Sequence, residues 1–353
     1  MRAFLLATLL VIAKPAAAQL REVVVRAVTA PEAAPLGYAV VSLPALGIER
    51  FAPSNGVVAL RVDASRTLHI RVKRLGFLPK DTTIALGDAR STTVVVALTR
   101  VSYELGAVRV VGWPPCRRPG IPRRGGDPTL RTIVGQLREN AERYRLLTRQ
   151  FPFEYEMRRE FGMLAEDSSY VVQSQESLVV DASPAWRYAP GKLVVREKPP
   201  AVEWELRIPN IRDLAEDTWV DNHCFHLVGI EEKGGERLLR IDIVAAARLR
   251  SVDANAIVWL DPKDFRLRHA EFTLSKRPPQ VPGLERTTAA VRFQDLIPFV
   301  PVMEFLENES VVRPVARMGE TPLSPRVLIE RQFIQGVRYK GARPDSLGRD
   351  TLP

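Results

Sequence analysis

The stretch that decides the fold of the first hundred residues is LHIRVKRLGFLPKDTTIAL, residues 68–86. Aliphatic and polar side chains alternate through its first half, which is the period of two of a strand with one buried face. Gly76 and Pro79 break this alternation, and Thr82–Leu86 resumes it. The stretch therefore predicts two strands joined by a turn, and we expect the neighbouring segments to be strands arranged around this pair.

Similar short runs fill most of the sequence on either side of this pair. Turn-forming residues separate them, among them Pro53-Ser54-Asn55-Gly56 and Gly87-Asp88. Short strands at this spacing, with alternating apolar positions, predict a seven-stranded β-sandwich. The expected strands are residues 20–28, 38–44, 57–62, 67–74, 81–86, 92–99 and 105–112.

Five segments of this region share the layout of one known module: VTAPEAAPLGYAVVSL (28–43), SNGVVALRV (54–62), VKRLGF (72–77), VVVALTR (94–100) and LGAVRVVG (105–112). Their order resembles the carboxypeptidase regulatory-like, or transthyretin-like, β-sandwich of bacterial envelope proteins. Ser54 and Val58 stand where that family usually has an acidic and an aromatic residue. The resemblance implies a non-catalytic module at residues 19–112, of a kind that accompanies zinc carboxypeptidases or precedes the plug of outer-membrane receptors.

The N-terminal residues 1–18 have the pattern of a secretory signal peptide. Arg2 is followed by an apolar core at 3–13 and by small residues that end at Ala18. A membrane anchor is the alternative, but the apolar run is too short to span a bilayer, and no later run approaches that length. We therefore expect export, cleavage after Ala18, and a periplasmic or outer-membrane-associated protein.

The charge of the chain is basic, with a formal net charge of +10 at pH 7. Removal of residues 1–18 takes away Arg2 and Lys14 and no acidic residue, which leaves a net charge of +8. A basic balance often indicates nucleic-acid binding. Because an exported protein rarely meets nucleic acid, we expect instead a solvated basic surface that can meet anionic components of the envelope.

The two cysteines, Cys116 and Cys224, form an even pair in a chain that is expected to enter an oxidising compartment. A disulfide between them would tie the inter-domain segment to the second domain. Two separate buried thiols remain the alternative, because spacing in the sequence does not show spatial proximity.

A linker and a helix are expected between the two halves. Residues 113–127, WPPCRRPGIPRRGGD, crowd proline, glycine and arginine without periodicity, which is typical of a linker, with a basic docking strip as the alternative. Asp127-Pro128 then forms a helix start, and apolar residues recur at helical spacing from Leu130 to Tyr144. We expect an amphipathic helix to about Thr148 that packs on the following domain; a helix lying on a membrane surface is the alternative.

The alternating pattern returns from Phe151 onward, with a short helix expected within Ile208–Asp217. LRIDIVAAARL (239–249) and AIVWLDPKDFRLRHAEFTL (256–274) resemble the curved antiparallel sheets of periplasmic lipoprotein-carrier and lipoprotein-receptor proteins. In that family a half-open barrel wraps a helix and holds acyl chains. The fold expected overall is mainly β: the sandwich, the helix, a large curved antiparallel sheet within residues 128–340, and a polar tail at 341–353.

Few residues of the sequence suggest a metal-binding, catalytic or ligand-binding site. His223, Cys224 and His226 are the metal-capable side chains that lie closest together, but structural metal sites need three or four ligands. The two histidines would also point to opposite faces of a strand, so we expect no metal ion. The chain has no Gly-x-Ser-x-Gly elbow, phosphate-binding glycine loop or dinucleotide motif. Four tryptophans could line a sugar or lipid site, although aromatic residues in sheets belong more often to the core: Trp186, Trp204, Trp219 and Trp259.

These features predict an exported, non-catalytic protein of the cell envelope, without a cofactor. Its C-terminal domain would bind a lipid, a lipoprotein or a protein partner. Two alternatives stay open: an accessory component of an outer-membrane receptor system, or a hydrolase with a carboxylate site among Glu154, Glu156 and Asp261. An enclosed apolar hollow in the second domain would favour a carrier, whereas a filled sheet would favour a docking surface.

Overall fold

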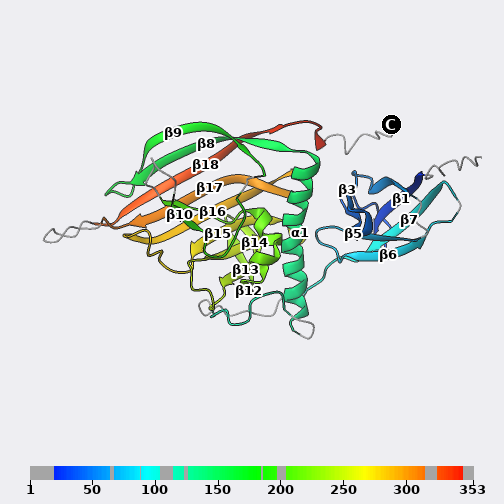
Figure 1. Cartoon of the computed structure of the whole chain (residues 1–353), viewed down its shortest axis with the longest axis horizontal. Helices are drawn as coiled ribbons and strands as arrows, with labels where there is room; N and C mark the ends of the chain where they lie inside the picture. Colours follow the sequence, from blue (N-terminus) through cyan, green and yellow to red (C-terminus); the bar gives the residue numbers. More distant parts are fainter. Residues whose placement is uncertain are drawn as a thin grey trace, which may run out of the picture.

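The computed structural model describes residues 20–63, 67–87, 89–103, 114–122, 126–183, 186–196, 204–314 and 324–344. Strands dominate both halves, which confirms the predicted mainly-β fold. A long helix, α1 (Pro128–Gln150), stands between a small sandwich and a large curved sheet (Figure 1). The expected signal segment at 1–18 and the strand expected at 105–112 lie outside the described residues.

The N-terminal half packs two small sheets face to face, with strand orders β4-β1-β7 and β3-β2-β5-β6. The alternation that predicted β5 is present, because Leu68, Ile70 and Val72 are buried while their neighbours are exposed. The short strand β3 was not predicted, because the turn η1 (Pro44–Leu46) and Gly47 precede it and suggest a loop. The strands are β1 (Leu20–Thr29), β2 (Val40–Leu43), β3 (Ile48–Phe51), β4 (Val57–Asp63), β5 (Thr67–Lys73), β6 (Lys80–Ala85) and β7 (Ser91–Leu98).

Helix α1 begins where the sequence predicted. Asp127 Oδ1 accepts hydrogen bonds from the backbone N–H groups of Thr129 and Leu130, at 2.9 and 3.1 Å, and Pro128 occupies the first turn. The helix ends at Gln150, two residues beyond the expected end. Its predicted apolar face is buried, so α1 is a core element of the protein.

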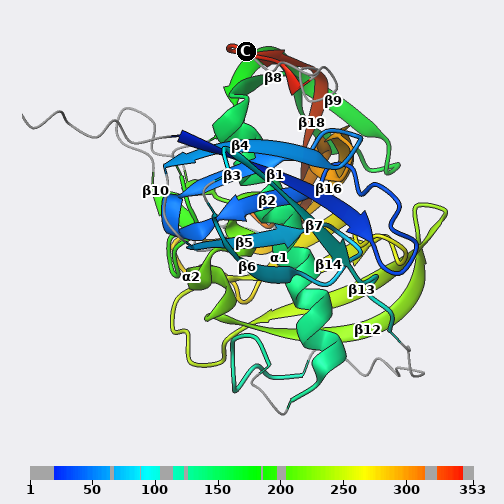
Figure 2. The ribbon, with the colours of Figure 1, turned by 90° about the vertical axis from the view of Figure 1, so that its right-hand side faces the viewer.

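The C-terminal half is built on one antiparallel sheet with strand order β12-β13-β14-β15-β16-β17-β18-β8-β9. The sheet curves, and α1 stands along one end of it (Figures 1 and 2). The expected short helix is present as two turns, η2 and α2. The elements are β8 (Phe153–Leu164), β9 (Tyr170–Asp181), β10 (Val194–Arg196), β11 (Trp204–Leu206), η2 (Ile211–Ala215), α2 (Asp217–Val220), β12 (His223–Lys233), β13 (Glu236–Ala245), β14 (Ala254–Leu260), β15 (Leu267–Leu274), β16 (Leu284–Ile297), β17 (Val300–Val312) and β18 (Arg326–Tyr339).

Polar contacts join the sandwich to α1. The turn after β5 reaches the helix where Gly76 N donates to Gln136 Oε1 at 2.8 Å, and Gln136 Nε2 donates to Phe77 O at 3.0 Å. Gly76 has a φ of +82°, and a Cβ there would lie 3.3 Å from Asp264 Cα, so the position favours glycine. Lys73 of β5 also pairs with Glu139 of the helix at 2.9 Å. The sandwich therefore contacts α1 directly through hydrogen bonds and an ion pair.

Candidate functional site

A hollow lies on the concave side of the large sheet, and strand register explains its lining. β16 and β17 pair Val291 with Leu306 and Phe293 with Met303, so that their apolar side chains share one face. At one edge of the sheet, β8 and β9 pair Tyr155 with Val180 on the same concave side. Alternation along each strand thus gathers apolar side chains from widely separated segments.

The space between this face, α1 and η2 is a cavity of about 180 Å³. We call it the apolar hollow. Its lining is predominantly aliphatic and aromatic. The residues are Tyr144, Tyr155, Val180, Asp181, Ala182, Ile208, Pro209, Asn210, Ile211, Leu214, Phe272, Val291, Phe293, Met303 and Leu306.

The turn η2, which covers one side of the hollow, is held by a capping box. Asn210 Oδ1 accepts a hydrogen bond from Arg212 N at 2.8 Å, and Asp213 Oδ2 accepts one from Asn210 N at 2.8 Å. Asp213 Oδ1 also accepts from Tyr188 N at 3.0 Å. These bonds fix the backbone that carries Ile211 into the hollow.

Two tyrosine hydroxyls in the wall are paired with groups of the wall itself. The hydroxyls of Tyr144 and Tyr155 lie 3.1 Å apart, and Tyr144 donates to Ala182 O at 2.7 Å. Burial raises the pKa of Tyr144 to about 12 and raises that of Tyr155 well above its ordinary value. Both phenols are therefore neutral at physiological pH, and this part of the wall presents no charge to a ligand.

The size of the hollow limits what it can hold. A cavity of roughly 150 Å³ with an apolar lining accepts benzene-sized molecules. A smaller space of about 20 Å³ shares Ile208, Pro209 and Phe272 with the hollow and extends along β15. The pair of spaces suits a short apolar segment, such as part of an acyl chain.

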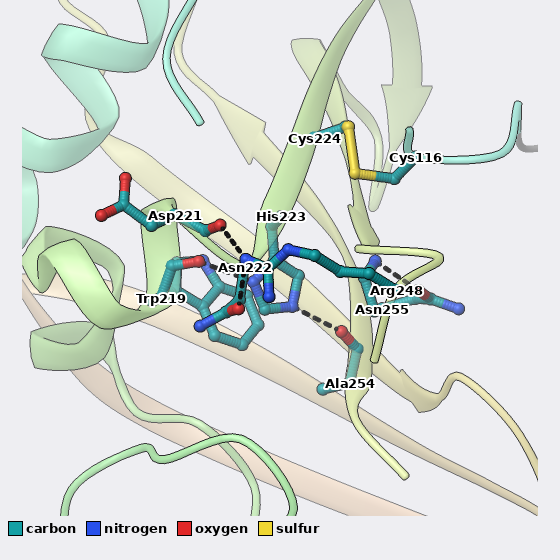
Figure 3. The surroundings of a disulfide bond; sticks show 10 residues. Cys116, Trp219, Asp221, Asn222, His223, Cys224, Arg248, Ala254 and Asn255 are labelled. Carbon is teal, nitrogen blue, oxygen red and sulfur yellow. Dashed lines mark hydrogen bonds between the residues drawn. A yellow bond between two sulfur atoms is a disulfide. The ribbon is translucent and has the colours of Figure 1, made fainter. Parts of the chain in front are cut away.

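The two cysteines form a disulfide, with an S–S distance of 2.11 Å (Figure 3). Backbone hydrogen bonds hold the same region, because Ala247 N donates to Cys116 O at 2.8 Å and Gly120 N donates to His223 O at 2.9 Å. The described part of the segment expected to be a linker is thus fastened to β12 and β13. Neither cysteine lines the hollow.

His223 is a buried structural residue beside the disulfide. Its Nδ1 lies 2.7 Å from Trp219 O and its Nε2 lies 2.9 Å from Ala254 O (Figure 3). Its ring also stacks on that of Trp219, with centroids 3.7 Å apart. Within the described residues, no group of three or more His, Cys, Asp or Glu side chains could hold a metal ion.

The three carboxylates considered for hydrolysis do not meet. Glu154 pairs with Arg338 at 2.9 Å and Glu156 is exposed on the same strand, β8. Asp261 caps the turn after β14, where its Oδ1 accepts from Lys263 N at 2.8 Å. Four strands of the sheet separate β14 from β8, so these residues do not form one site.

None of the four tryptophans lines the apolar hollow. Trp219 and Trp259 are buried, and the indole N–H of Trp259 bonds to Glu231 Oε1 at 2.5 Å. Trp186 packs partly against the core, whereas Trp204 is partly exposed on β11.

The sequence did not reveal which apolar residues would leave a space. Alternation marked the inward positions of β8, such as Tyr155, and helical spacing marked Tyr144. Whether those positions pack tightly depends on the distance between sheet and helix, which alternation does not encode. The lining residues of η2, such as Ile211, had only the weak signal of a short expected helix.

Comparison with known proteins gives no family for this chain: no known family matches the sequence, and no curated protein is similar to it. Solved structures with similar parts include a domain named for outer-membrane lipoprotein sorting from Vibrio parahaemolyticus (11% identity, 61% of this chain and 97% of that one, TM-score 0.30). A LolA-superfamily protein from Nitrosomonas europaea matches at 15% identity over 62% and 99%, with a TM-score of 0.29. A DUF1329 family protein from Desulfovibrio piger matches at 12% identity over 63% and 99%, with a TM-score of 0.31. At such TM-scores, function has to be argued from the residues of this chain.

Proposed function

We propose that this protein is an exported, non-catalytic binding protein of the cell envelope that holds an acyl chain of a lipid or lipoprotein in the apolar hollow. The observation that carries the proposal is the hollow itself, a space of about 180 Å³ walled by apolar side chains of α1, η2 and the curved sheet. Ligand sites are typically concave and mostly apolar, with a few polar groups. Residues 1–18 support the location, because their pattern is that of a secretory signal.

The chemistry of the wall supports a binding role. The Tyr144 and Tyr155 hydroxyls are occupied by hydrogen bonds and kept neutral by burial, so they offer a ligand no ready acid, base or nucleophile. No helix among the described residues is long and apolar enough to cross a membrane. An acyl ligand would reach such a protein from a membrane or from a lipoprotein partner.

A pair of neighbouring valines on β9 allows a direct test. Val180 lines the hollow, whereas Val179 points to the other side of the strand with 49% of its surface exposed. We expect Val180→Trp to fill part of the hollow and to weaken binding of the neutral dye N-phenylnaphthylamine by about tenfold, because the added ring occupies the ligand's space. Val179→Trp is the matched control and should bind the dye as the unaltered protein does.

Two measurements decide the outcome. Dye fluorescence gives the affinities, and mass spectrometry under native conditions shows whether protein purified from bacterial envelopes carries acyl-containing molecules. Equal loss of dye binding in both valine variants, or no dye binding by the unaltered protein, would contradict the proposal.

A further inference from the structure

A second, polar hollow of about 450 Å³ lies beside the apolar one. We call it the arginine hollow. It is formed where the C-terminal half of α1 meets β3 of the sandwich and the turn η2. Four arginines and two glutamates supply its charges: Arg145, Arg149, Arg187, Arg212, Glu49 and Glu142.

The two hollows are neighbours along three short stretches of chain. Ala182, Ile211 and Tyr144 line the apolar hollow, and the residue that follows each of them lines the arginine hollow. One molecule with an apolar part and a polar part could therefore contact both spaces. The sequence order apolar-then-polar at all three places sets the boundary between them.

The acids nearby do not fully engage the arginines. Glu49 pairs with Arg149 at 2.6 Å, whereas Glu142 forms an ion pair with Lys73 of the sandwich. Glu216, from outside the hollow, lies 3.6 Å from Arg145 and 4.0 Å from Arg187, both at the long end of ion-pair distances.

Arg212 is the arginine best placed to receive an anion. It is half-buried, and among the described residues its guanidinium forms no ion pair and donates no hydrogen bond, although its charge acts at longer range on the carboxylates of Asp181 and Asp213. Its charge reaches the wall of the apolar hollow, because after burial and the hydrogen bond from Tyr155 it is the next influence on the pKa of Tyr144. A guanidinium offers a fork of donors that fits a carboxylate or phosphate group.

We infer that the arginine hollow binds the anionic head of an amphiphile whose apolar part occupies the apolar hollow. This inference rests on the proposed function and names its ligand class: an acyl chain that carries a carboxylate or phosphate. Glu49 of β3 helps to form the hollow, so the sandwich contributes one wall to the site. A neutral lipid would offer the guanidinium of Arg212 no anionic group to bind.

The experiment compares a fatty acid with its own methyl ester, titrated against the full-length protein at pH 8 and low salt. The two ligands share a chain and differ in charge, so their affinity ratio reports the head group alone. We expect the acid to bind about tenfold more tightly than the ester. Added sodium chloride should weaken the binding of the acid and leave the binding of the ester unchanged. Arg212→Ala and Arg212→Gln should bring the acid-to-ester affinity ratio close to one.

Arg61→Ala is the matched control, because Arg61 is an exposed arginine on β4 of the sandwich and its loss changes the net charge equally. It should keep the full preference for the acid. Inorganic phosphate serves as a further ligand and should compete only weakly with the acid, since it lacks the chain.

The outcomes separate the two proposals. If neither ligand binds, the proposed function fails. If acid and ester bind equally and the Arg212 variants have the same affinities as the unaltered protein, the apolar hollow binds acyl chains but the arginine hollow does not bind an anionic head. Strong displacement of the acid by phosphate, with no loss of ester binding, would identify a site for free anions and would overturn the inference.

Discussion

The two sides of α1 pack in different ways. Toward the sandwich the helix buries polar and charged groups that form specific bonds: Gln136 bonds to the turn at Gly76, and Arg143 donates to Tyr38 O at 2.6 Å. Among the described residues, Arg143 Nη1 and Glu139 Oε1 form no hydrogen bond and lie 3.7 Å apart. Toward the sheet the helix presents mainly apolar side chains such as Tyr144, and the packing there leaves a cavity. The exception is the buried amide of Asn140, which donates to Phe265 O at 2.8 Å and accepts from Leu267 N at 2.9 Å. One side is closed by directional bonds, and the other is left partly unfilled.

The difference shows where each half of the protein is fixed. Buried hydrogen bonds tolerate little displacement, since an unpaired polar group costs about 1–3 kcal/mol. Apolar contacts are non-directional and permit adjustment of side chains around a ligand. The sandwich is thus a rigid support for one side of the helix, while the opposite side can accommodate an apolar guest.

The largest effect is expected where the polar side of α1 is broken at Arg143. Its side chain is fully buried, and its Nε also donates to Phe299 O at 2.8 Å. Arg143→Ala would leave two backbone carbonyls without donors and would deprive Glu139 of a cationic neighbour 3.7 Å away. We expect a loss of about 3–5 kcal/mol in the free energy of unfolding, measured by urea denaturation.

Arg145→Ala provides the control for that substitution, because Arg145 lies two residues further along the same helix and its side chain is 46% exposed. Its removal should change the free energy of unfolding by less than about 1 kcal/mol. Similar losses in both variants would show that α1 is not held through buried polar contacts.

A somewhat smaller effect is expected for the disulfide, which fastens the segment between the two halves. Cys116 and Cys224 are separated by 108 residues, so the bond closes a long loop in the unfolded chain. Cys116→Ala with Cys224→Ala should lower the free energy of unfolding by about 2–4 kcal/mol. Acyl binding should persist, because neither cysteine lines the apolar hollow; loss of binding in a folded double variant would place the bond within the site.

The sequence predicted most of this framework because burial leaves a periodic trace. The alternation of Leu68, Ile70 and Val72, and the helical spacing that ends at Tyr144, both mark faces that are buried in the structure. The cap at Asp127 was readable because its chemistry is local. Each of these features depends on residues that are close in the sequence.

The contacts that position the site were not readable for the converse reason. Arg143 is polar and looks like part of a solvated helix face, yet its partners Tyr38 and Phe299 come from segments over a hundred residues away. That the guanidinium of Arg212 forms no ion pair within the described part of the chain likewise follows from which acids fold near it. Such pairings depend on tertiary packing, which a single sequence does not specify.

A moderate effect is expected at Gln136, the second polar contact of the helix. Gln136→Leu keeps a similar shape but removes the acceptor for Gly76 N and the donor for Phe77 O. We expect a loss of about 1–3 kcal/mol in the free energy of unfolding, measured by urea denaturation, because both buried backbone groups are left without a hydrogen bond. Gln136→Glu keeps the acceptor and loses the donor, so its free energy of unfolding should lie between those of the unaltered protein and Gln136→Leu. A smaller loss for Gln136→Leu than for Gln136→Glu would show that the added charge matters more than the lost hydrogen bonds.

The smallest effect is expected on the unfilled side, and it compares two leucines directly. Leu147 of α1 is fully buried in the core, whereas Leu306 of β17 lines the apolar hollow and is only partly buried. Truncation to alanine in a packed core costs about 2–5 kcal/mol, because contacts are lost and a cavity opens. Leu306 already borders empty space and has fewer contacts to lose, so Leu306→Ala should cost about 1 kcal/mol. The same truncation should enlarge the hollow and improve binding of longer acyl esters relative to shorter ones, as titration of an ester series would show. Equal costs at the two leucines, with no change in chain-length preference, would mean that the sheet side of the helix is packed as closely as the rest of the core.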